Sequence, residues 1–116
     1  MAKHFYFTLS HGLRGCYMPD ADPQTIMVKT RRELKEAIAS ELFGMEDDMV
    51  GLSKKNIAAF AALCWREAHK DKPAYLPHCL PCHDRSVKIA KHSYGIFCSV
   101  ASRAEYLEAQ REAEAV

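Results

Sequence analysis

The change in hydrophobic period along the chain constrains its fold more than any other feature. Apolar and polar residues alternate at the start, which places Phe5, Phe7 and Leu9 on one face of a half-buried strand. At Thr30 the period changes, and apolar residues then recur three and four positions apart, as on the buried face of a helix. Strands followed by helices in one short chain predict the α+β class.

Further strands are expected on both sides of the helical region. The glycine-containing turn over 10–15 allows 16–18 to pair back as a short second strand. Residues 25–29 are rich in β-branched side chains and predict a third strand. Towards the C-terminus, 94–100 predicts a strand in a hairpin with 87–90, although the pattern of 87–90 also fits a short helix.

Two helices are predicted in the middle of the chain. Thr30 and Glu33 fit a capping box before a helix over 31–43. Ser53 is a suitable N-cap for a second helix over 54–70, which has the clearest periodicity in the chain. Its apolar stripe consists of Ile57, Phe60, Ala61, Cys64, Trp65 and Ala68.

A third helix is predicted after Ser102, which forms a second capping box with Glu105. Its end, 108–116, is rich in Ala and Glu and is expected to fray. Three prolines four residues apart, at 73, 77 and 81, predict a segment that crosses the surface in extended or turn conformations.

A length of 116 residues fits one domain over 1–116. The expected architecture is a mostly antiparallel sheet of about four to five short strands, packed on one side by the three helices. No apolar run approaches the roughly 18 residues that span a bilayer, and no signal-peptide core is present. We therefore expect a cytoplasmic protein that has no membrane partner.

The net charge of +1 conceals an uneven distribution of charge. Residues 1–48 carry six bases and eight acids, and residues 49–93 carry eight bases and three acids. No five adjacent residues are all basic, so a nucleic-acid-binding tail is not indicated. The basic middle predicts either a solvated helix face or a binding surface.

Two groups of residues are candidates for a binding surface. The first is the loop tip of Leu13 and Arg14, since arginine is a common anchor at interfaces and for phosphate, although a plain hairpin turn explains the loop equally well. The second is the set of bases on the predicted second helix, namely Lys54, Lys55, Arg66 and Lys70.

The segment that contains Cys79, Cys82 and His83 is the strongest motif for chemistry. It matches the c-type haem attachment pattern, it resembles a thioredoxin-type Cys-x-Pro-Cys pair, and it could supply zinc ligands. The absence of an export signal argues against haem, and the flanking segments argue against the redox pair. A zinc site lacks a second well-spaced ligand pair, so a loop without special chemistry and no cofactor is the leading interpretation.

Two of the other three cysteines, Cys64 and Cys98, are expected to be core residues. Cys64 lies on the apolar stripe of the second helix, and Cys98 alternates with apolar residues on the last strand. No nucleophile, base and orienting group can be assembled from spacing, so a catalytic function is not expected.

The segments 6–20, 30–35 and 74–78 resemble small proteins encoded by bacteriophages and other mobile elements of proteobacteria. The resemblance implies a short protein that acts on host machinery by contact, as anti-CRISPR inhibitors do. We therefore expect a non-enzymatic interaction protein, an inhibitor of a host defence complex, whose partner is a host protein complex. The net charge excludes the acidic DNA-mimic class. The alternative is a small zinc-binding or nucleic-acid-binding module centred on Cys79 and Cys82.

Overall fold

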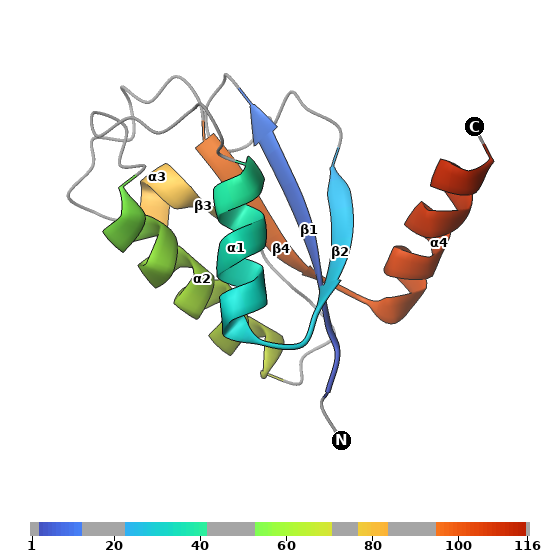
Figure 1. The fold of residues 1–116 in the computed structure, drawn as a ribbon, viewed down its shortest axis with the longest axis horizontal. Coiled ribbons are helices and arrows are strands. Elements are labelled where there is room, and N and C mark those ends of the chain that lie inside the picture. The colour runs from blue at the N-terminus through green and yellow to red at the C-terminus, as the bar shows by residue number, and fades with distance from the viewer. Residues whose placement is uncertain (1–2, 13–22, 42–52, 71–76, 84–94, 116) are drawn as a thin grey trace.

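The structure is a computed structural model that describes residues 3–12, 23–41, 53–70, 77–83 and 95–115. Within these residues the elements follow the order β1 (Phe5–Gly12), β2 (Gln24–Val28), α1 (Arg31–Glu41), α2 (Lys54–Ala68), β3 (His78–Cys79), α3 (Leu80–His83), β4 (Gly95–Ala101) and α4 (Arg103–Glu114) (Figure 1). The α+β class is confirmed. The predicted strand 16–18, the partner segment 87–90 and the loop tip of Leu13 and Arg14 lie outside the described residues.

The described strands form one antiparallel sheet in the order β2-β1-β4-β3. β1 lies between β2 and β4, and Phe7 on this strand is in register with Ile26 on one side and Val100 on the other. The first and last parts of the chain therefore share the centre of the sheet. β2 and β3 are the outer strands.

The hydrophobic core lies between the sheet and the pair α1 and α2, which cover one face (Figure 1). The predicted alternation is confirmed, because Phe5, Phe7 and Leu9 are all buried. The stripe of α2 is confirmed as well, since its apolar residues are buried or partly buried in the same cluster. The buried residues contributed by α1 and α2 are Leu34, Ile38, Ile57, Phe60, Ala61 and Cys64.

Side-chain caps define where the long helices begin. The amide of Glu33 donates to Thr30 Oγ1 at 3.2 Å, and the Thr30 hydroxyl donates to the Glu33 carboxylate at 3.3 Å. Before α2 the amide of Asn56 donates to Ser53 Oγ at 3.3 Å. The amide of Glu105 donates to Ser102 Oγ at 3.1 Å before α4. All three predicted N-caps are confirmed, because each hydroxyl accepts from one amide that lacks an intrahelical partner.

The expected position of the C-terminal helix on the same face as the other helices is wrong. α4 buries no residue, and its Tyr106 contacts Tyr6 at a ring-centroid distance of 5.3 Å. Tyr6 faces away from the core, since it alternates with Phe5 and Phe7 on β1. α4 therefore lies on the other side of the sheet and leans away from it (Figure 1). Its few large apolar residues form a stripe too narrow to replace α1 or α2 on the core face.

The expectation that the proline-spaced segment crosses the surface is also wrong for its last part. His78–Cys79 forms the short outer strand β3, and Cys79, Leu80 and Pro81 are buried. Pro81 stands in the first turn of α3, where the amide that proline lacks has no helical partner. A two-residue edge strand followed by a single helical turn therefore accommodates Pro81 and still reaches the core.

Candidate functional site

A groove of about 640 Å³ runs between α1 and α2 on the outer side of the helical layer. Three of its lining residues are cations from the start of α1, and the others are small residues from the middle of α2. We call this site the basic groove; its described lining residues are Arg31, Arg32, Lys35, Ala58, Ala59, Ala61 and Ala62.

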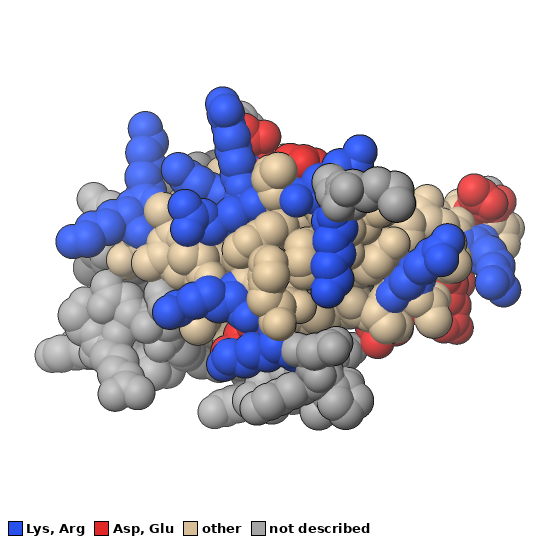
Figure 2. Space-filling model, turned by 90° about the horizontal axis from the view of Figure 1, so that it is seen from below, with Lys and Arg blue, Asp and Glu red and all other residues tan. Residues whose placement is uncertain are grey.

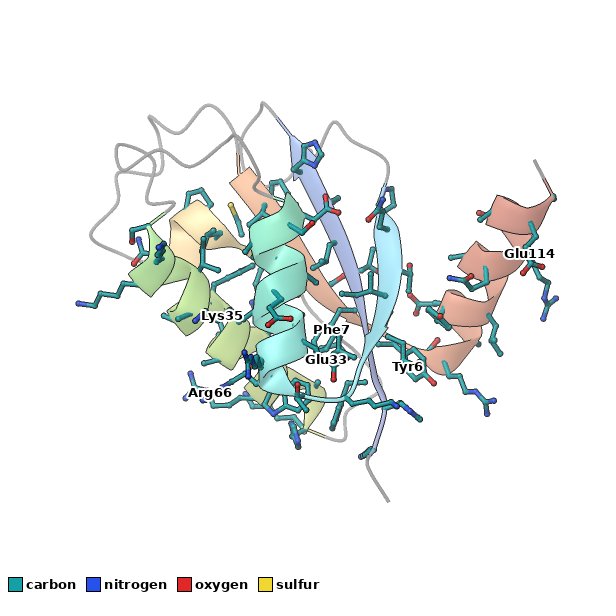
Figure 3. The ribbon with its side chains drawn as sticks, in the orientation of Figure 1. Tyr6, Phe7, Glu33, Lys35, Arg66 and Glu114 are labelled. Atoms are coloured by element: carbon teal, nitrogen blue, oxygen red, sulfur yellow. The ribbon has the colours of Figure 1, made fainter. Side chains whose placement is uncertain are left out.

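The helical period explains why α1 presents cations to the groove. Arg31 and Lys35 are one turn apart and therefore share a side of the helix, whereas Glu33 is turned about 200° from Arg31 at roughly 100° per residue. Figure 3 shows Lys35 on the α2 side of α1 and Glu33 on the other side. The Glu33 carboxylate accepts a hydrogen bond from the Thr30 hydroxyl at the cap, on the side of α1 that faces away from the groove.

The three cations of α1 differ in their ion pairs. Arg32 Nε lies 3.3 Å from Glu36 Oε1, but both side chains are largely exposed, so water and salt weaken this pair. Within the described part of the chain, Arg31 and Lys35 take part in no ion pair. None of the described acidic residues therefore neutralises these two charges.

α2 supplies the floor of the groove, and two of its cations lie further along the same helix, outside the lining. Lys55, Ala59, Ala62 and Arg66 are spaced four, three and four residues apart, so they form one outward stripe beside the groove. Lys55 and Arg66 are exposed and stand roughly 16 Å apart at about 1.5 Å per residue. The alanines between them are small, so the floor is low and a ligand backbone can approach closely.

The sequence-predicted bases of α2 are all exposed, but they do not form one cluster. Lys54 and Lys55 lie at one end of the helix, and Arg66 and Lys70 lie at the other. Lys70 Nζ is also engaged by Glu67 Oε1 at 2.7 Å. These four bases are not among the described lining residues of the basic groove, and their role as a binding surface stays a prediction.

Sequence reasoning missed Arg31, Arg32 and Lys35, because they lie in the segment with an excess of acids and beside a capping box. Two signals could have identified them. Arg31 and Lys35 are four residues apart, which places both on one exposed side of a helix. The alanines at 58, 59 and 62 are not part of the apolar stripe that the next helix buries.

The helix dipoles make these cations unfavourable for stability. Arg31 and Arg32 occupy the first turn of α1, and Lys54 and Lys55 occupy the first turn of α2, which has no acidic residue there. A cation at a helix N-terminus opposes the dipole and costs roughly 0.3–1 kcal/mol. Departures from local preference are typical of functional positions, so this pattern supports a role in binding.

The cations also gather on the surface at the scale of the whole molecule. Figure 2 views the molecule from below Figure 1, where α1 begins and α2 ends, and Lys and Arg surround an uncharged area on this face. Asp and Glu are sparse there and are seen mainly towards α4. The net charge of the chain is thus near zero, but its positive charges are concentrated at α1 and α2.

The predicted burial of Cys64 and Cys98 is confirmed, since both are almost completely inaccessible. Burial raises the pKa of the Cys98 thiol well above its ordinary value, and the adjacent Cys64, through its hydrogen bond and charge, raises this pKa further. Both residues are therefore placed as small core side chains rather than as reactive thiolates.

The raised pKa of Cys98 predicts a loss of stability in alkaline solution. Above about pH 9 the unfolded chain releases the thiol proton, whereas the folded protein keeps it. The free energy of unfolding is therefore expected to be constant below this pH and to fall above it, by up to about 1.4 kcal/mol per pH unit until the folded pKa is passed. Chemical denaturation between pH 7 and 10.5 measures this slope. Cys98→Val should lose it, and parallel profiles for the two proteins would contradict the assignment.

The proposed zinc ligands are only partly described. Cys79 is a buried residue of β3, and Cys82 belongs to α3, but the side chains of Cys82 and His83 lie outside the described residues. Among the residues whose positions are described, no three His, Cys, Asp or Glu are grouped so that they could hold a metal ion.

In the described part of the chain, no helix has both the length and the apolar character of a transmembrane segment. Comparison of the chain with known protein families, with curated proteins and with solved structures finds no match.

Proposed function

We propose that this chain is a non-enzymatic binding protein whose basic groove holds an acidic helix of a partner protein. The observation that carries the proposal is the combination of a low alanine floor with a wall of three cations, of which Arg31 and Lys35 have no ion pair within the described residues. Such a groove offers both apolar contact and charge to a helix laid along it.

The chemistry of the groove favours carboxylates on a helix. Alanine side chains leave room for a partner helix to approach α2 closely, and its apolar residues can then cover the floor. Arg31 and Lys35 stand on the same wall one turn apart, which matches acidic residues spaced four apart on a facing helix. The arginine guanidinium can also bind a carboxylate through two parallel hydrogen bonds.

The same groove is less suited to nucleic acid. None of the described lining residues is aromatic, so unpaired bases have no stacking platform. The net charge of +1 provides only a weak long-range field for a polyanion. We therefore assign the groove to a protein and treat nucleic acid as an outcome of the test.

Binding to a helical peptide rich in Glu, Ala and Leu tests the proposal. Arg31→Glu/Lys35→Glu is expected to weaken binding at least about tenfold, since two attractive charges become repulsive. The variant should keep its thermal stability, because a carboxylate at position 31 suits the N-terminus of α1. Fluorescence anisotropy of the labelled peptide at two salt concentrations measures the affinity.

Arg103→Glu/Arg111→Glu provides the matched control. It makes the same change in net charge, and Arg103 is the first residue of α4 just as Arg31 is the first residue of α1. The control should bind the peptide as tightly as the unaltered protein. Equal affinity of the groove variant would refute the proposal, and tighter binding of a duplex or single-stranded oligonucleotide would replace it with a nucleic-acid site.

We further propose, from the resemblance, that the partner belongs to a host defence complex that the protein inhibits. Occupying an acidic surface is sufficient to block assembly, so no catalytic residue is required. Expression in a proteobacterium with active CRISPR immunity should restore transformation by a targeted plasmid. The groove variant should lose this effect, and an unchanged transformation frequency with the unaltered protein would exclude this target.

A further inference from the structure

α4 is an unusual element because it stands outside the core. It extends over Arg103–Glu114 without a single buried residue, and Leu107 remains 41% exposed. Helices shorter than about 12–15 residues are marginal in water without tertiary packing. Most of the surface of α4 is therefore available for a contact with another molecule (Figure 1).

The charge of α4 is opposite to that of the basic groove. The helix carries two bases and four acids. Glu108 and Glu112 are exposed and one turn apart, and therefore share a side of α4. This exposed side thus has the charge inferred for a groove ligand, namely two carboxylates four residues apart.

We propose that α4 of one copy docks in the basic groove of a second copy of this chain. The inference rests on the proposed function, since it uses the same groove. Glu108 and Glu112 would face Arg31 and Lys35 across the alanine floor. α4 cannot reach the groove of its own chain in this fold, because Tyr106 holds it against the face of the sheet opposite to α1 and α2.

This contact joins two different surfaces, so each copy offers one helix and one groove. Two copies can close as a reciprocal pair, or further copies can add as a chain. The contact is small and electrostatic, so it should be weak and salt-sensitive. It would also occupy the groove in the absence of another ligand, so an acidic partner helix would have to displace α4.

Sedimentation velocity of the full-length chain at low salt, over a range of concentrations, tests this inference. The unaltered protein should self-associate, and association should weaken at least about tenfold between 50 mM and 500 mM salt. Glu108→Lys/Glu112→Lys and Arg31→Glu/Lys35→Glu should each remain monomeric. An equimolar mixture of the two variants should form a 1:1 complex, because the unaltered α4 of one variant matches the unaltered groove of the other and the altered α4 matches the altered groove.

The charge exchange also provides the controls. A chain that carries all four substitutions should self-associate again, which loss of folding cannot produce. The inference is overturned if the unaltered protein is monomeric at all concentrations, or if the α4 variant associates as strongly as the unaltered protein. Binding of the acidic peptide to the monomeric α4 variant separates the two proposals: if the peptide binds, only self-association has failed, and if it does not, the groove itself is refuted.

Discussion

Phe7→Ala is expected to lower the free energy of unfolding by about 3–5 kcal/mol, the largest effect among the substitutions considered. Phe7 is completely inaccessible and lies on β1 at the centre of the sheet, between Ile26 and Val100. Its ring centroid is 6.4 Å from that of Trp65, so it joins the sheet to α2. Alanine removes this contact and leaves a cavity between β1 and α2.

Urea denaturation followed by circular dichroism measures this loss. A domain of this size has roughly 5–15 kcal/mol of stability, so the variant should unfold at much lower denaturant concentration or be largely unfolded. Phe7→Leu is the graded control, because leucine retains most of the apolar contact and should cost clearly less. Met27→Ala on the adjacent strand should have little effect, since that side chain is 39% exposed. A loss for Phe7→Ala as small as that for Met27→Ala would show that Phe7 is not a core residue.

Gly95→Ala is expected to destabilise the protein by about 1–3 kcal/mol through overpacking. A Cβ added at Gly95 would lie 2.9 Å from Pro81 Cδ and 3.1 Å from Cys79 Sγ. Pro81 is buried and its ring is rigid, so it cannot move aside without shifting β3 and α3. The absence of a side chain at position 95 therefore allows the chain around α3 to lie directly against β4.

A double-mutant cycle checks this explanation. Pro81→Ala removes the two ring atoms nearest to the added Cβ, so Gly95→Ala should cost less in the Pro81→Ala background than in the unaltered protein. The coupling is measured as the difference between the unfolding free energies of the four proteins. Strict additivity would indicate that the cost at position 95 arises from the backbone and not from this contact.

Several features could be predicted from the sequence because they depend on neighbours along the chain. The alternation around Phe7 identified β1 and its buried face, and the stripe through Phe60 identified α2. The hydroxyls of Thr30 and Ser102 marked helix starts, since a cap bonds to an amide three residues away. These patterns have the period of a single element, so no tertiary information is needed to recognise them.

The cations that line the basic groove could not be predicted from the distribution of charge along the chain. Lys55 and Arg66 were identified from the excess of bases in the middle of the chain, but Arg31 and Lys35 lie in a stretch where acids outnumber bases. A count of charges along the chain adds residues from all sides of a helix, whereas in the folded helix these residues point in different directions. α1 directs Lys35 towards α2 and Glu33 away from it (Figure 3), so a neutral helix contributes a basic wall.

The sequence by itself determined the α+β class, the starts of α1, α2 and α4, and the residues that α2 and β1 bury. Only the tertiary structure decided that Pro81 packs against Gly95, that α4 lies across the sheet from α1 and α2, and that the cations of α1 share one groove with the alanines of α2. The physical reason is the range of the interactions. Hydrophobic periodicity and helix capping depend on residues three or four positions apart. The fit of Pro81 against Gly95, the choice of helices that cover the core face and the sides that α1 and α2 turn towards each other depend on residues that meet only after the chain has folded.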